Sequence, residues 1–321
     1  MKLGMVGLGR MGSGMTERLR GDGHEVMTYD PQVESTASSL EDLAQQLEAP
    51  RVVWMMIPAG EITEKTTREL IGILDRDDVL VDGGNSNFHD SQRRNAEAAE
   101  QGVHFLDVGV SGGIWGLKEG FCLMAGGPDE AVARIQPALE TLAPKDGWAH
   151  VGPSGAGHFV KMVHNGIEYG LMQAYAEGFD VFDKCEFELD NARIAHLWGQ
   201  GSVVRSWLCE LAARAFEVDG NGLEAIEGYT EDSGEGRWTI ADATAHDVPT
   251  PVITASLYAR LRSRGNGDFA DRVLAALRNQ FGGHAVKSAG TSHAEQGATA
   301  ATGSANRKSK PAIVAEPRVG G

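Results

Sequence analysis

The N-terminal half of the chain alternates short apolar runs with polar segments that are rich in alanine, glutamate and glutamine. Five apolar runs have the length of buried strands, namely KLGMVGL, HEVMTYD, RVVWMMIP, DVLVDGG and VHFLDVGV, and GFCLMAGG is a candidate sixth. Segments such as SSLEDLAQQLEA and SQRRNAEAAEQG separate them. Strands that alternate with helices are typical of a doubly wound parallel sheet. The first half of the chain is therefore predicted to have an α/β fold.

A glycine-rich turn follows the first apolar run. The stretch GLGRMG has G-x-G-x-x-G spacing, and the next residues read as a helix that ends at glycine. The spacing alone is a weak signal in a chain with 42 glycines, but its place between a strand and a helix makes it specific. Such a turn lets the backbone approach a pyrophosphate at the helix N-terminus. A Rossmann-type dinucleotide site is therefore predicted at Gly7, Leu8, Gly9, Arg10, Met11 and Gly12.

The second apolar run ends at an acidic residue, Asp30, which lies 18 positions after Gly12. A carboxylate at that place can accept hydrogen bonds from the ribose hydroxyls of NAD, and it would repel the 2′-phosphate of NADP. No arginine follows Asp30 directly. NAD is therefore the preferred cofactor, while a deazaflavin stays open because the glycine spacing does not exclude it.

The sequence pattern changes near residue 157. Long helical patterns replace the strand signals there, and the loop GPSGAG at 152–157 is rich in residues that break regular structure. We expect a dinucleotide-binding Rossmann domain at 1–156 and an all-helical domain at 157–286. The remaining segment, 287–321, is poor in bulky apolar residues and rich in Gly, Ala and Ser, which predicts a disordered tail.

Composition excludes several classes of protein. The net charge of −16 disfavours nucleic acids and anionic membranes as partners. No run of 18 apolar residues and no cleavable signal pattern is present, and the three cysteines lie far apart without metal-binding spacing. We expect a cytoplasmic protein without a metal-binding cluster, and an anionic small-molecule substrate stays open because a local basic pocket can outweigh the acidic surface.

One helix carries an unusual polar face. In KMVHNGIEYG, four polar residues lie at i, i+3, i+4 and i+7, so a helix would place them on one side. They are Lys161, His164, Asn165 and Glu168. One interpretation is the solvated face of a surface helix. The other is the floor of a substrate cleft, because the helix begins just after the predicted domain boundary.

The stretch VKMVHNGIEYG resembles the active-site helix of the 6-phosphogluconate dehydrogenase family, which belongs to the β-hydroxyacid dehydrogenases. The resemblance implies that Lys161 is the general base for the 3-hydroxyl of the substrate. It implies that Glu168 is the acid that protonates C1 after carbon dioxide leaves. His164 and Asn165 would orient the substrate, and Tyr169 would contact its phosphate.

Further motifs of the family occur in order along the chain to about residue 286. DGGNS, VSGG, DSGEGRWT, SLYARLRS and RNQFGGH resemble substrate-binding elements, and they carry Asn85, Ser111, Gly112, Gly113, Arg237, Arg260, Arg278 and His284. Asn85 would also lie near the nicotinamide, and Arg278 and His284 would reach a neighbouring subunit's site. Alternatives are a surface position for Arg260, an ion pair for Arg237 and a helix C-cap for His284.

The chain also departs from the family pattern. Ser233 and Glu235 replace a lysine and a threonine of the signature that DSGEGRWT resembles, which puts the phosphate contacts of that segment in doubt. The helical part is about half as long as in long-chain members, which implies a short form that assembles as a homodimer or homotetramer.

The resemblance implies an NAD-dependent oxidoreductase of the oxidative pentose phosphate pathway. It would convert 6-phosphogluconate to ribulose 5-phosphate and carbon dioxide. Two alternatives stay open: a related β-hydroxyacid dehydrogenase that acts on a non-phosphorylated acid, and a dinucleotide-binding protein without catalytic activity.

Overall fold

The computed structural model describes residues 1–265, 269–274 and 276. Residues 1–265 belong to one compact unit, and the described residues from 269 on belong to a second. The predicted division near residue 157 falls inside the first unit and stays a prediction. Arg278, His284 and the predicted tail at 287–321 lie outside the described residues.

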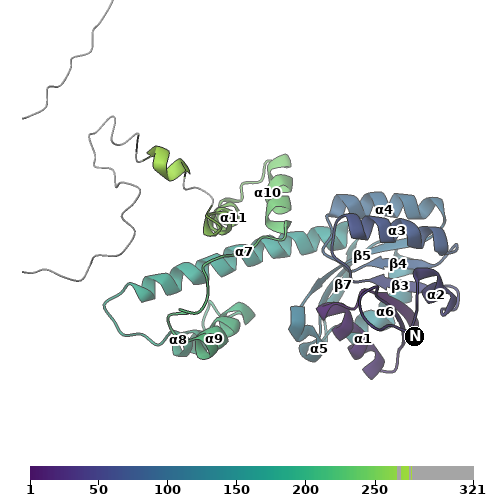
Figure 1. Ribbon diagram of the computed structural model, residues 1–321, viewed down its shortest axis with the longest axis horizontal. Helices are drawn as coiled ribbons and strands as arrows, with labels where there is room; N and C mark the ends of the chain where they lie inside the picture. Colours follow the sequence, from purple (N-terminus) through teal and green to yellow (C-terminus); the bar gives the residue numbers. More distant parts are fainter. Residues whose placement is uncertain (266–268, 275, 277–321) are drawn as a thin grey trace, which may run out of the picture. The chain divides into compact units, whose positions relative to one another are not determined.

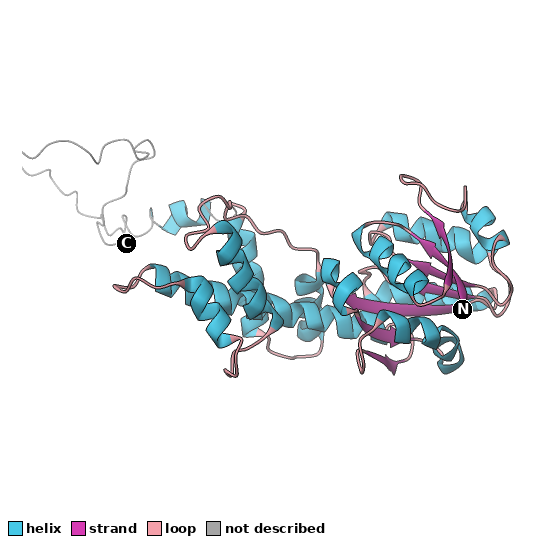
Figure 2. Cartoon of the chain, turned by 90° about the horizontal axis from the view of Figure 1, so that it is seen from below, coloured by secondary structure: helices cyan, strands magenta, loops and turns pink. Residues whose placement is uncertain are grey.

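The first unit contains a seven-stranded sheet in the order β2-β1-β3-β4-β5-β6-β7. Neighbouring strands are parallel except for β5 and β6. Strands occur only before Ala156 in the described chain, and helices follow (Figure 2). The α/β fold class is therefore confirmed. The strands are β1 (Lys2–Val6), β2 (Glu25–Tyr29), β3 (Val52–Met55), β4 (Val79–Asp82), β5 (His104–Ser111), β6 (Cys122–Gly126) and β7 (Trp148–Gly152).

Two features of the sheet differ from the sequence prediction. The segment between β5 and β6 contains only the short helices η1 (Gly113–Trp115) and α5 (Gly116–Glu119). A parallel return needs a crossover of about a dozen residues or more, so β6 runs antiparallel to β5. The edge strand β7 was not predicted, because its side chains are largely exposed and it lacks a continuous apolar run.

Both faces of the sheet are covered by helices (Figure 1). Side chains alternate in direction along a strand. In β4, Val79 and Val81 therefore pack in one apolar cluster with α1 and α6, and Leu80 packs in the other with α2, α3 and α4. This two-sided burial explains the continuous apolar runs in the sequence. The covering helices are α1 (Arg10–Gly21), α2 (Leu40–Gln45), α3 (Glu61–Ile73), α4 (Phe88–Glu100) and α6 (Asp129–Leu142).

A long helix, α7 (Ala156–Asp183), leads from the sheet into the helical part. Its first turns contact β5, β6 and β7, and α10 and α11 pack against it (Figure 1). Helices α8 and α9 pack against each other. The helices that follow α7 within residues 184–265 are α8 (Asn191–Trp198), α9 (Trp207–Asp219), α10 (Glu235–Ala245) and α11 (Pro251–Ser263).

Candidate active site

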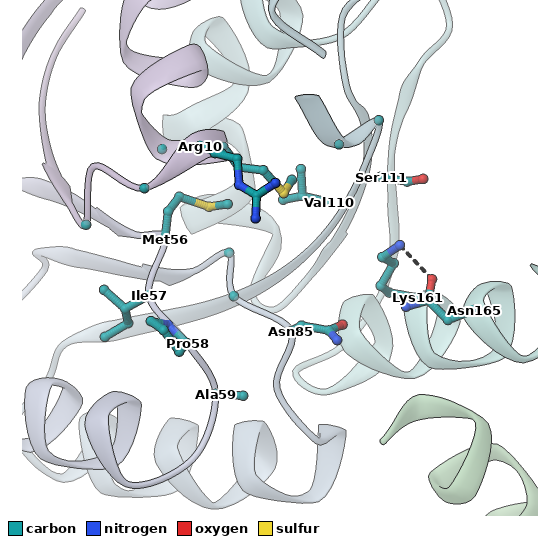
Figure 3. Close-up of a pocket in the computed structure, with 18 of the residues that line it drawn as sticks. Arg10, Met56, Ile57, Pro58, Ala59, Asn85, Val110, Ser111, Lys161 and Asn165 are labelled. Carbon is teal, nitrogen blue, oxygen red and sulfur yellow. Dashed lines mark hydrogen bonds between the residues drawn. The ribbon is translucent and has the colours of Figure 1, made fainter. Parts of the chain in front are cut away.

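A cavity of about 1730 Å³ opens where the carboxyl ends of the parallel strands meet α7 and α9. This is the edge at which open α/β sheets bind ligands. Figure 3 shows Arg10 at the start of α1, side chains from the loops after β3 and β4, and Ser111 at the end of β5 around the space beside α7. Most residues predicted to form the site line this cavity: Gly7, Gly9, Arg10, Met11, Gly12, Asp30, Asn85, Ser111, Gly112, Gly113, Lys161, His164, Asn165 and Glu168.

The glycine turn has the geometry of a pyrophosphate cradle. Gly7 has a φ of +92°, and a Cβ on Gly12 would lie 2.0 Å from the carbonyl oxygen of Gly7. A Cβ on Gly9 would meet nothing within 4 Å, so the space beside the N-terminus of α1 is open. No side chain caps that terminus, and its N–H groups are available to an anion. These residues fit the pyrophosphate of a dinucleotide.

Asp30 links the end of β2 to the glycine turn. Its Oδ2 accepts the N–H of Leu8 at 2.7 Å, and its Oδ1 accepts the N–H of Gln32 at 2.8 Å. Each carboxylate oxygen keeps further acceptor capacity for a ribose hydroxyl. Leu8 differs from its neighbours in the turn, because it is bonded to Asp30 and does not line the cavity.

Buried charged side chains fix the conformation of the loop after β4. The Oδ1 of Asp82 accepts the N–H of Gly84 at 3.0 Å, and its Oδ2 accepts the hydroxyl of Ser86 at 2.8 Å. Arg94 is 2 % exposed and donates to the same Oδ2 at 3.1 Å. These bonds fix the backbone on both sides of Asn85, whose amide faces the cavity (Figure 3).

Close backbone packing places α7 against the sheet. A Cβ on Gly109 of β5 would lie 2.5 Å from the Cβ of Lys161, so only glycine fits there. The buried carboxylate of Asp107 accepts the N–H groups of Gly155 at 2.6 Å and His158 at 2.9 Å, which caps the helix. Burial raises the pKa of Asp107. The first turn of α7 is therefore anchored, and Lys161 lies directly beyond it.

The polar face of α7 forms a hydrogen-bonded group on the cavity wall. Lys161 Nζ donates to Asn165 Oδ1 at 2.7 Å (Figure 3), and His164 Nδ1 lies 2.9 Å from the same oxygen. His164 Nε2 lies 3.3 Å from the hydroxyl of Ser111, and Nδ1 lies 3.9 Å from Glu168 Oε2. This face is therefore the wall of a cleft rather than a solvated surface.

The surroundings of Lys161 shift the pKa of its amine. Burial lowers the pKa of Lys161, and the negative charges of Glu168 and Glu235 act in the opposite direction, with a smaller effect from Cys122. An amine with a lowered pKa can accept a proton near neutral pH.

Three residues predicted to contact a phosphate form a separate cluster. The guanidinium carbon of Arg260 lies 3.4 Å from the ring centroid of Tyr169, and its Nη1 donates to the carbonyl oxygen of Glu231 at 3.0 Å. Arg237 pairs with Asp232 at 3.0 Å. Tyr169, Arg237 and Arg260 do not line the cavity.

Sequence reasoning missed part of the cavity wall. The loop after β3 contributes Met56, Ile57, Pro58 and Ala59, and α9 contributes Trp207. The loop could have been found from the rule that parallel strands end at one edge of the sheet. Trp207 carried no motif. Among the described residues, no group of His, Cys, Asp or Glu could hold a metal ion, and no helix is long and apolar enough to cross a membrane.

Comparison with known proteins decides the family. Residues 2–152 match a family model described as the NAD binding domain of 6-phosphogluconate dehydrogenase, and residues 157–276 match the C-terminal domain of the same enzyme. The chain belongs to the 6-phosphogluconate dehydrogenase family. It is thus an oxidoreductase with an NAD-binding domain, as the sequence predicted.

Individual proteins that are similar to this chain carry the name of the same enzyme. An NAD(+)-dependent, decarboxylating 6-phosphogluconate dehydrogenase of Haloferax volcanii is 42% identical over 297 residues, which cover 89% of this chain and 98% of that one. A putative 6-phosphogluconate dehydrogenase of Bacillus subtilis, YqeC, is 39% identical over 89% of this chain and 99% of its own. The 6-phosphogluconate dehydrogenase of Plasmodium falciparum superposes with a TM-score of 0.75 at 26% identity, covering 91% of this chain and 67% of that one.

Proposed function

We propose that this chain catalyses the NAD-dependent oxidative decarboxylation of 6-phosphogluconate to ribulose 5-phosphate and carbon dioxide, in the oxidative pentose phosphate pathway. The observation that carries the proposal is one cavity with two kinds of wall. The glycine turn and Asp30 line one side, and Lys161 and Glu168 line the other. A dinucleotide on the first wall would meet a sugar acid on the second.

Lys161 is the proposed base of the oxidation. Burial lowers the pKa of its amine, which increases the neutral fraction. One N–H is held by Asn165 Oδ1 at 2.7 Å, so the nitrogen lone pair remains for the proton of the 3-hydroxyl. NAD, when bound, supplies the acceptor for the hydride of C3.

The same residues suit the two later steps. Oxidation yields a β-keto acid, and protonated Lys161 can donate a hydrogen bond to the oxygen on C3 while the bond to carbon dioxide breaks. The resulting enediol needs a proton on C1, for which Glu168 is the proposed donor. Seven residues of helix separate Lys161 and Glu168 by about 10 Å along the axis, so they can bracket the substrate from two ends.

The proposed binding of the 6-phosphate depends on arginine side chains. Arg260 and Arg237 are bonded to protein partners and do not line the cavity. Arg278 and His284 lie outside the described residues, and their proposed place in a neighbouring subunit's site would require a homodimer or homotetramer. The protein partners of Arg260 and Arg237 favour a second candidate, a related dehydrogenase acting on a non-phosphorylated β-hydroxy acid.

An initial-rate assay separates the two candidates. Purified protein is given 6-phosphogluconate or gluconate, each with NAD and with NADP, and both reduced cofactor and carbon dioxide are measured. Reduction with stoichiometric carbon dioxide from 6-phosphogluconate alone is the expected result, with NAD faster than NADP. Equal rates with gluconate would favour the second candidate, and no turnover with any pair would contradict both.

A further inference from the structure

A buried carboxylate lies behind the polar face of α7. Glu235, the first residue of α10, is 1 % exposed. Its Oε1 accepts a hydrogen bond from Asn165 Nδ2 at 3.0 Å. Its Oε2 is buried and has no hydrogen-bond partner among the described residues. Burying a carboxylate is costly unless charges and donors compensate it, so the role of this group needs an explanation.

We propose that Glu235 is a positioning residue that sets the direction of the hydrogen bonds around Lys161. This inference rests on the proposed function, in which Lys161 is the base. Glu235 does not line the cavity, and it acts through Asn165 rather than on the substrate.

The two ends of the Asn165 side chain differ in their hydrogen-bonding chemistry. An amide presents an NH₂ group at one end and an oxygen at the other, and an ionised carboxylate can only accept hydrogen bonds. Glu235 therefore requires that the NH₂ of Asn165 points towards α10. The oxygen of Asn165 is then directed to Lys161 Nζ, 2.7 Å away. The reversed amide would point N–H groups at the amine and remove this contact.

The orientation of the Asn165 amide also fixes which ring nitrogen of His164 carries the proton. With Asn165 Oδ1 held as an acceptor, the nitrogen 2.9 Å from it, Nδ1, must carry the proton. In neutral His164, Nε2 is then an acceptor, and it lies 3.3 Å from the hydroxyl of Ser111. One carboxylate thus orders four side chains, so that Lys161 directs its lone pair to the cavity and Ser111 donates to His164.

The charge of Glu235 also acts on Lys161. The ionisable groups near Lys161 are His164 and Glu168 on its own helix, Glu235 on α10 and Cys122 on β6. Burial lowers the pKa of Lys161, and Glu235 partly opposes that effect. Loss of the Glu235 charge should therefore lower the pKa further.

This role also accounts for the departure from the family signature. Glu235 stands where the signature has a threonine, and its side chain points to Asn165 instead of to the Arg260 and Tyr169 cluster. In this proposal, Glu235 therefore acts on the proposed base, Lys161, rather than on the phosphate of the substrate.

The test compares Glu235→Gln and Glu235→Asp with a matched control, Thr239→Val. Thr239 lies one turn along α10 and is 5 % exposed, and its hydroxyl bonds to the carbonyl oxygens of Met162 on α7 and of Glu235, so it shares the contact between the helices but has no bond to the carboxylate of Glu235. Glu235→Gln keeps the size of the side chain but accepts either amide orientation. We expect its kcat to fall by about tenfold or more with KM nearly unchanged, because general-base steps depend on alignment. The kcat of Glu235→Asp should lie between that of the wild type and that of Glu235→Gln.

The pH profile of kcat/KM separates positioning from a structural role. The acidic limb, which reports Lys161, should move to lower pH in Glu235→Gln and stay in place in Thr239→Val. An unshifted limb together with a wild-type kcat in Glu235→Gln would overturn the proposal.

A second readout does not depend on the substrate. The pKa of Lys161 is measured by NMR in protein with ¹³C-labelled lysine, and the signal is assigned by its loss in Lys161→Met. A lower pKa in Glu235→Gln would support the link to Glu235 even if the wild type failed to oxidise 6-phosphogluconate, in which case only the proposed function fails. An unchanged or higher pKa would overturn the inference even in an active enzyme.

Discussion

The sheet part and the helical part of this chain bury their apolar residues to different extents. Residues 1–152 contain two large clusters of buried side chains, one on each face of the sheet. Among the described residues from 156 on, the corresponding cluster is small and centres on Phe179 and Phe216. Large apolar side chains such as Val181, Val203 and Val218 are exposed there. The sheet is therefore complete within the chain, whereas the helices leave an apolar surface open to solvent.

This difference bears on the active site. The cofactor wall and the anchor of α7 belong to the densely packed sheet, so their geometry is set within one chain. The cluster of Arg260 and Tyr169 lies on α7 and α11, in the less buried part. We expect substitutions in the sheet part to lower the free energy of unfolding. Substitutions on the exposed helical surface should change that free energy little in the isolated chain.

The largest effect is expected at the junction of the two parts, in Lys161→Met. Removing the base should lower kcat by about 10³-fold, which corresponds to about 4 kcal/mol in the activation barrier. The melting temperature and the affinity for NAD should stay near the wild-type values, because methionine keeps the aliphatic contact with Gly109 and Lys161 belongs to neither apolar cluster of the sheet. Single-turnover kinetics measure the loss. Turnover within a few-fold of the wild type would remove Lys161 as the base.

Arg94→Leu tests the sheet part. The substitution would leave the fully buried carboxylate of Asp82 without its cation, which typically costs about 3–5 kcal/mol. Urea denaturation should report this loss in the free energy of unfolding. The double variant with Asp82→Leu should lose less than the sum of the two single variants. A loss below about 1 kcal/mol in Arg94→Leu would contradict the comparison.

Glu64→Gln tests how the sheet part responds to acid. Arg93 donates to both oxygens of Glu64 at 2.7 Å and, with Arg94, lowers the pKa of that carboxyl to about 2. The stabilisation that this ion pair contributes is present above the unfolded-state pKa of 4.5. It is lost as the pH falls through the folded-state pKa of about 2. After discounting for solvent screening, we expect the variant to lose about 2 kcal/mol at pH 7 and little at pH 2. Equal losses at both pH values would rule out this charge effect.

Asp30→Ala combined with Pro31→Arg tests the cofactor wall. The variant lacks the acceptor for the ribose hydroxyls and carries a cation for a 2′-phosphate. The ratio of kcat/KM for NAD to that for NADP should fall by about tenfold or more, since each lost or gained charged contact contributes about 1.5–3 kcal/mol. The single variant Pro31→Arg is the control for the added charge. An unchanged ratio in the double variant would remove Asp30 as the selectivity residue.

The smallest effect is expected on the helical surface, in Val203→Ser. Val203 is fully exposed, so the free energy of unfolding should change by less than about 0.5 kcal/mol. Sedimentation measured at several protein concentrations provides the second readout. A large loss of stability would show that another molecule covers this surface in solution. The contrast with the sheet would then hold only for the isolated chain.

Local patterns determined much of what could be predicted from this sequence. The strands through β6 followed from continuous apolar runs, since a sheet covered on both faces requires them. The glycine turn and Asp30 were predictable because the steric demands of a tight turn act over a few residues. The polar face of α7 followed from helical spacing alone. The edge strand β7 had no such pattern, because its side chains are mostly exposed.

Only the tertiary structure decided which distant residues meet. Gly109 has to be glycine because Lys161 lies against it, and Glu235 bonds to Asn165 across a sequence separation of 70 residues. Tyr169 follows Glu168 directly, yet the helical turn points it away from the cavity towards Arg260. Backbone preferences and side-chain periodicity are short-ranged, so a sequence can specify the elements and their polar faces. The partners of a buried carboxylate depend on how those elements pack, which is a property of the folded chain.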